Sequence, residues 1–97
     1  MKIRYNALAR ADVVDILKYY ELEAGHQTAV DFFAELSLVI KRIAATPFAF
    51  HEVKQGIRRC LLRRFPYQIN YEVVAPSTIK ILVVKHQQRD PDFGLDR

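Results

Sequence analysis

The spacing of the apolar residues changes once along this chain, and that change limits the folds open to it. Up to Pro47, apolar residues recur at the spacing of one helix face. After Gly56 they alternate with polar residues, which is typical of strands with one buried face. Helices followed by strands predict an α+β fold. At 97 residues the chain is expected to form a single domain over residues 1–97.

The first half predicts a short strand and two helices. Lys2–Tyr5 alternates as a strand would, and Asn6 is a candidate N-cap for the first helix. Gly25 ends that helix and Pro47 ends the next, so the short connection should make them an antiparallel hairpin. The faces expected to be buried are Val13, Ile16, Leu17 and Tyr20, and then Ala29, Phe32, Phe33, Leu36, Ile40 and Ile43, with Arg10, Asp12, Asp15 and Lys18 left to water.

The second half predicts three further strands and an irregular tail. The strands fall at Ile57–Arg64, Tyr67–Val73 and Ile79–Val84, and the tail begins at Gln87. Their short connections favour an antiparallel meander whose one face is covered by the helices. Tyr67 and Tyr71 share a face with Ile69 and Val73, and are therefore expected in the core.

The orientation of the first of these three strands stays open. If Cys60 and Leu62 face the helices, Arg59 and Arg63 lie on the open face of the sheet. Ile57 and Leu61 favour the reverse arrangement.

Positive charge is concentrated in the second half. Residues 1–50 hold six Lys/Arg and six Asp/Glu, whereas residues 53–89 hold eight Lys/Arg and a single acid, Glu72. This asymmetry favours an anionic partner, either nucleic acid or an acidic protein segment, over a face that is merely solvated. The candidate target-binding residues are Arg58, Arg59, Arg63, Arg64, Lys85, His86 and Arg89.

Several functional classes find no support in the residues. His26, His51 and His86 lack the spacing of a metal site, and there is no Gly-rich phosphate loop or G-x-S-x-G motif, so we expect neither metal nor cofactor. The single cysteine, Cys60, excludes an intrachain disulfide and suits a reducing cytosol. Within a strand it is expected to be buried rather than reactive. No apolar run is long enough to span a membrane, and no signal core follows Met1, so a cytoplasmic protein without a membrane partner is expected.

Several segments stand in a recognisable order. They are Ala29-x-x-Phe32-x-x-x-Leu36 with Thr46-Pro47, then Gly56-Ile57-Arg58-Arg59, then Arg64-Phe65-Pro66-Tyr67-Gln68-Ile69-Asn70-Tyr71-Glu72-Val73, and finally Lys85-His86-Gln87-Gln88-Arg89-Asp90-Pro91. Together they resemble the RelE/ParE toxin superfamily, the toxin halves of bacterial type II toxin–antitoxin (plasmid stabilisation) modules. The resemblance covers essentially the whole chain and implies a helical hairpin packed on a small antiparallel sheet.

The resemblance is closer to the ParE-like branch than to the nuclease branch. RelE-type nucleases typically have an arginine, a lysine and a tyrosine where this chain has Gln68, Leu61 and Phe93. Phe65-Pro66-Tyr67 and Arg89-Asp90-Pro91 are more like the ParE type. The resemblance therefore implies a toxin without a nuclease site, which poisons DNA gyrase through its basic sheet face and tail. It also implies a cognate, ParD-like antitoxin whose acidic amphipathic segment wraps the helical hairpin and part of the sheet.

Two alternatives remain at this stage. In a RelE-type mRNA endoribonuclease acting on the ribosome, Arg59, Arg63 and Arg89 would hold phosphates while His86 or Lys85 moved protons, with Tyr67 a further candidate. The other alternative is a toxin that has lost its activity.

Overall fold

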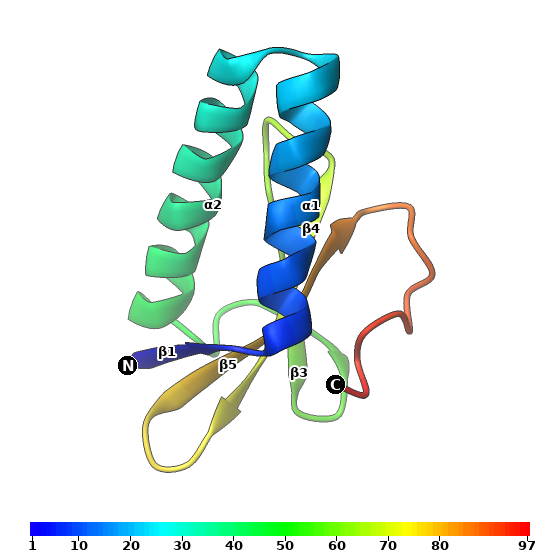
Figure 1. The fold of residues 1–97 in the computed structure, drawn as a ribbon. Coiled ribbons are helices and arrows are strands. Elements are labelled where there is room, and N and C mark those ends of the chain that lie inside the picture. Colours follow the sequence, from blue (N-terminus) through cyan, green and yellow to red (C-terminus); the bar gives the residue numbers. More distant parts are fainter.

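The computed structural model describes residues 1–97 and arranges them in two layers (Figure 1). Helices α1 (Ala7–Glu23) and α2 (His26–Ala45) form an antiparallel hairpin on one face of a five-stranded sheet. The strands are β1 (Lys2–Tyr5), β2 (His51–Lys54), β3 (Ile57–Leu61), β4 (Tyr67–Val74) and β5 (Thr78–His86). The predicted α+β class and helical hairpin are confirmed.

The sheet is larger and more mixed than the sequence indicated. Its strand order is β1-β5-β4-β3-β2, and β2 to β5 form an antiparallel meander. The expectation of a meander of only three strands was wrong, because β2 adds a fourth. The sheet is also not purely antiparallel, since β1 lies parallel to β5, with Lys2 opposite Thr78. The first and last strands of the chain are thus neighbours.

The helices begin near the residues that the sequence indicated as their boundaries. The side chain of Asn6 accepts a hydrogen bond from the Leu8 amide at 2.8 Å, as an N-cap does. Gly25 adopts φ 96°, a conformation that a side chain would oppose, and α2 begins at the next residue. One residue of the expected buried stripe is misplaced: Phe33 is 51% exposed, because Phe32, Leu36, Val39 and Ile43 define the face that meets the sheet.

The core between helices and sheet settles the orientation of β3. Cys60 and Leu62 pack into it together with Phe32, Ile69 and Tyr71. Burial raises the pKa of the Cys60 thiol, so its expected role as an inert buried residue is supported. Ile57 faces the opposite side of the sheet, where it packs in a second, smaller cluster.

A bulge in β5 explains why apolar residues also lie on that opposite side. Asn70 pairs with Val83 and Tyr71 with Ile81, which leaves Leu82 without a partner. Both Leu82 and Val83 then turn away from the helices, into the smaller cluster with Ile57 and Leu95. The nearly continuous apolar run of β5 therefore serves two clusters, one on each face.

Residues 87–97 are irregular, as expected, and cover this second cluster. Lys85 of β5 holds this tail against the sheet, because its ammonium group donates hydrogen bonds to the carbonyls of Asp90, Pro91 and Phe93 at 2.8–3.0 Å. At the far end the Arg97 guanidinium contacts Asp12 of α1 at 2.7 Å. Asp12 was expected to face water, but its side chain is only 17% exposed. None of the helices combines the length and apolar character needed to cross a membrane.

Candidate functional site

Two of the expected target-binding cations hold parts of the fold together. Lys85 is 4% exposed and is occupied by the tail carbonyls, so burial lowers its pKa despite the nearby Asp90. Arg58 donates to the carbonyls of Phe48 and Phe50 at 3.3 and 2.8 Å and fixes the loop between α2 and β2. Lys85 is therefore buried away from a partner, whereas Arg58 is only partly buried, and its role as a target contact stays a prediction.

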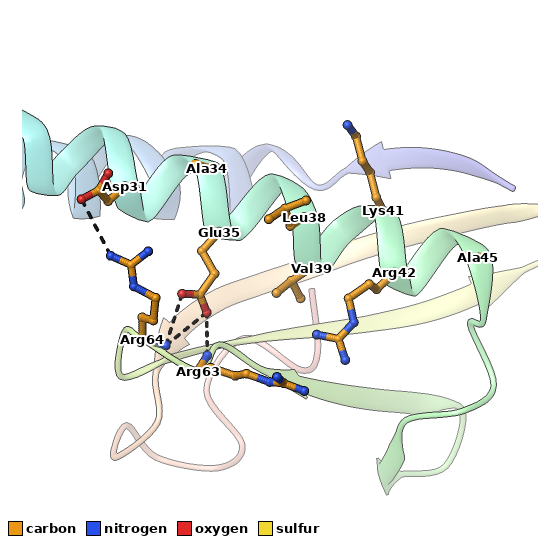
Figure 2. A pocket seen from close by; sticks show the side chains of 10 residues that line it. All are labelled: Asp31, Ala34, Glu35, Leu38, Val39, Lys41, Arg42, Ala45, Arg63 and Arg64. Atoms are coloured by element: carbon orange, nitrogen blue, oxygen red, sulfur yellow. Dashed lines mark hydrogen bonds and ion pairs between the residues drawn. The ribbon is translucent and has the colours of Figure 1, made fainter.

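Arg63 and Arg64 lie beside α2, not on the open face of the sheet. The Glu35 carboxylate accepts hydrogen bonds from the backbone N–H groups of both, at 2.6 Å and 3.2 Å, and so fastens the β3–β4 loop to α2 (Figure 2). The Arg64 guanidinium approaches Asp31 at 3.8 Å. β3 ends at Leu61, so the alternation that would have placed Arg63 with Arg59 no longer applies.

A groove runs along α2 above this loop. We call it the α2 groove; it has a volume of about 730 Å³ and is lined by Asp31, Ala34, Glu35, Leu38, Val39, Lys41, Arg42, Ala45, Arg63 and Arg64. Leu38 is 61% exposed although it is large and apolar. Arg42 points toward the sheet and Lys41 away from it (Figure 2). Three cations of the lining, Lys41, Arg42 and Arg63, take part in no ion pair, while the Glu35 carboxylate is bound by the loop backbone.

Arg59 and Arg89 come together on the opposite face of the sheet. Both line a cleft of about 270 Å³, which we call the tail cleft, between the C-terminal tail and strands β2 to β4. The other residues of its lining are His51, Val53, Gln68, Asn70, Gln87 and Pro91. No carboxylate is among them, so this cleft concentrates positive charge.

The four residues of the nuclease alternative are not assembled into one site. Arg59 and Arg89 line the tail cleft, whereas Arg63 lines the α2 groove on the other side of the sheet. His86 is exposed and its ring packs edge-on against Tyr67, 5.4 Å away. His86 lies opposite Tyr67 in the sheet and does not line the tail cleft that Arg59 and Arg89 line, so the proton-transfer and phosphate-holding groups do not share one site.

The tyrosines are placed in the core, as expected. Tyr67 packs against Tyr20 and Phe32 in an aromatic cluster under the helices, and Tyr71 is 0% exposed. Burial raises the pKa of Tyr67 above its usual value and that of Tyr71 to about 12. Neither is suited to accept a proton near neutral pH, and neither ring is free to stack on a base.

The fold is that of a small α+β protein, with a helical hairpin packed on one face of a five-stranded sheet. A sequence model of the family described as "ParE toxin of type II toxin-antitoxin system, parDE" matches residues 3–91. The chain belongs to the ParE toxin family.

Among solved structures, the chain is similar to one titled "Chromosomal ParDE TA system from P. aeruginosa", with 22% identity and a TM-score of 0.76. The match covers 89% of this chain and 95% of the other, and at this identity it demonstrates the shared fold. None of the curated proteins matches the chain.

The sequence did not single out several residues of these two surfaces. Leu38 and Arg42 fall between the positions of the buried stripe of α2, and only the position of the β3–β4 loop turns them into a groove. His51 lies on β2, the strand that was not predicted. A signal for β2 existed in the short distance between Pro47 and Gly56, which leaves room for a hairpin strand.

Proposed function

We propose that this protein is the toxin of a type II toxin–antitoxin pair, that it stops growth by poisoning DNA gyrase, and that a cognate antitoxin neutralises it. Membership of the ParE toxin family supports the first part. The similar structure comes from a ParDE system, which supports a cognate antitoxin partner for this chain as well. His86 is not among the residues that line the tail cleft with Arg59 and Arg89, which favours a binding toxin over an RNA-cleaving one.

The α2 groove is the proposed seat of the antitoxin. Its lining includes Ala34, Leu38, Val39 and Ala45, which offer apolar surface to a helix laid along α2. Arg42 and Arg63 offer unpaired positive charge at its edge. An acidic amphipathic segment matches both features, and a segment that folds on binding gains charge complementarity as well as apolar burial.

The first experiment follows macromolecular synthesis after the chain is expressed alone in a bacterial host. Thymidine and amino-acid incorporation are measured in parallel over the first minutes. A gyrase poison stops thymidine incorporation while translation continues. If amino-acid incorporation collapses first, the gyrase proposal is wrong and the protein acts on translation. If neither falls, the protein is inactive as a toxin.

A second experiment tests the antitoxin seat. The product of a small open reading frame adjacent to this gene is coexpressed with the wild-type chain, with Leu38→Asp, and with Arg59→Gln. Leu38 is exposed in the groove, so the Asp variant should fold and remain toxic but lose rescue by the antitoxin. Arg59 lies on the other face of the sheet, so Arg59→Gln should still bind the antitoxin. Full rescue of Leu38→Asp would contradict the proposed seat.

A further inference from the structure

The tail cleft is built on a row of side chains that crosses three strands. His51 of β2 lies opposite Arg59 of β3, and Arg59 lies opposite Asn70 of β4. Directly paired residues have their side chains on the same face, about 4.5–5.5 Å apart at Cβ. An imidazole, a guanidinium and an amide therefore stand side by side on the face that the helices do not cover.

The tail supplies the opposite wall. Arg89 extends from it, and its guanidinium lies over the Phe93 ring, 4.1 Å from the ring centre. Stacking of this kind orients the planar group and leaves its N–H edges available to a ligand. Gln87 is bound to the carbonyls of Leu62 and Tyr67, which fixes the start of the tail against the sheet.

The donors of the cleft have no anionic partner within the chain. The three ion pairs of the structure involve other residues, so neither Arg59 nor Arg89 is neutralised. Asn70 is 1% exposed, and its side-chain oxygen accepts a hydrogen bond from Gln68 at 3.0 Å. Asn70 lines the cleft, so its amide group borders this space.

The acids of the tail, Asp90, Asp92 and Asp96, line a separate surface that Arg89 also borders. The Asp90 side chain accepts a hydrogen bond from the Asp92 backbone, and both carboxylates act on Lys85 beneath the tail. Neither lines the cleft. The lining of the cleft thus holds two unpaired guanidinium groups, an imidazole and an amide, and no acid.

We propose that the tail cleft is a binding site for a phosphate group. Two guanidinium forks with two further polar groups offer more donors than a carboxylate's two oxygens use, and suit the three or four oxygens of a phosphate. A volume of about 270 Å³ lies just below the usual range for small-molecule pockets, which fits one phosphate with part of its sugar. The proposal does not depend on gyrase being the target.

The phosphate has two sources, and the ligands tested distinguish them. Calorimetric titrations use inorganic phosphate, a nucleoside 5′-monophosphate, and a single-stranded DNA oligonucleotide without terminal phosphates, at about 0.15 M ionic strength to screen unspecific attraction. Binding of the monophosphates alone identifies a terminal phosphate as the ligand. Binding of the oligonucleotide identifies a backbone phosphodiester.

Matched arginine variants locate the binding. Arg59→Gln removes one fork and should weaken binding of the preferred ligand by about tenfold or more. Arg63→Gln makes the same charge change on the other side of the sheet, and should alter affinity by less than about twofold. Far-UV circular dichroism checks that both variants fold. Equal loss in both variants, or no binding of any ligand by the wild-type protein, would overturn the proposal.

Discussion

We expect the substitution Asp12→Ala to destabilise the fold strongly, although it removes only a small side chain. Its carboxylate accepts from the Arg97 guanidinium at 2.7 Å and from the backbone N–H of Val84 at 3.1 Å. Helix α1, strand β5 and the tail thus meet at one side chain. The Asp12 and Arg97 side chains are 17% and 12% exposed, so water screens their contact little.

The expected loss of stability follows from the two groups that Asp12→Ala leaves without a partner. Removing one partner of a buried ion pair costs about 3–5 kcal/mol, because the other charge stays buried and unpaired. The Val84 N–H loses its acceptor as well, at about 1–3 kcal/mol. Since Arg97 lies in the tail and is able to move into water, we expect a total near the lower end of this sum, about 4 kcal/mol. The total free energy of unfolding of a native protein is about 5–15 kcal/mol, so this loss would be a large part of it.

Urea unfolding followed by far-UV circular dichroism measures this loss. Asp15→Ala is the matched control, since Asp15 is exposed on the same helix and should cost less than about 0.5 kcal/mol. The double variant Asp12→Ala/Arg97→Ala should be no less stable than Asp12→Ala alone, because it no longer buries an unpaired charge. A loss below about 1 kcal/mol for Asp12→Ala, or strictly additive losses in the double variant, would refute the argument.

Two further predictions concern the core and the tail. Burial raises the pKa of Tyr71 from 10.0 to about 12, so its contribution to stability is complete below pH 10 and is lost as the pH rises toward 12. We expect Tyr71→Phe to lessen the alkaline loss of stability, measured by urea unfolding across that range, and an unchanged pH profile would contradict this. Gly94 has φ 81°, and a Cβ there would lie 2.8 Å from the Val83 side chain, so Gly94→Ala should displace the tail. Gly56 has a similar φ of 79°, but no atom lies within 4 Å of a Cβ at this position. Gly94→Ala should therefore lower the stability of the fold more than Gly56→Ala does. Equal melting temperatures of the two variants would show that the tail does not pack as described.

The features that the sequence predicted correctly are local ones. Asn6 caps α1, Gly25 separates the helices, and the Tyr67–Val73 alternation places Tyr71 in the core because each depends on near neighbours in the chain. β2 was missed because an edge strand buries little: of His51–Lys54 only Val53 is partly buried, and the segment shows no apolar alternation.

The sites were harder to predict than the elements, because they depend on contacts between distant residues. A run of arginines looked like one basic face, yet Arg59 and Arg63 lie on opposite sides of the sheet. Lys85 resembled a surface cation until the tail folded over it. The bulge at Leu82 shifts the alternation of β5, and a nearly uniform apolar run cannot indicate where such a shift occurs.

The parallel pairing of β1 with β5 has a consequence for how the chain acquires its structure. The α1–α2 hairpin and the β2–β5 meander join neighbouring segments, which closes short loops. β1 has no partner until residues 78–86 exist, because its only neighbour in the sheet is β5. During synthesis β1 therefore cannot pair with another strand until nearly the entire chain has been made. Contacts so far apart in sequence slow folding, and the sheet of a nascent molecule remains incomplete until its last strand, β5, has left the ribosome.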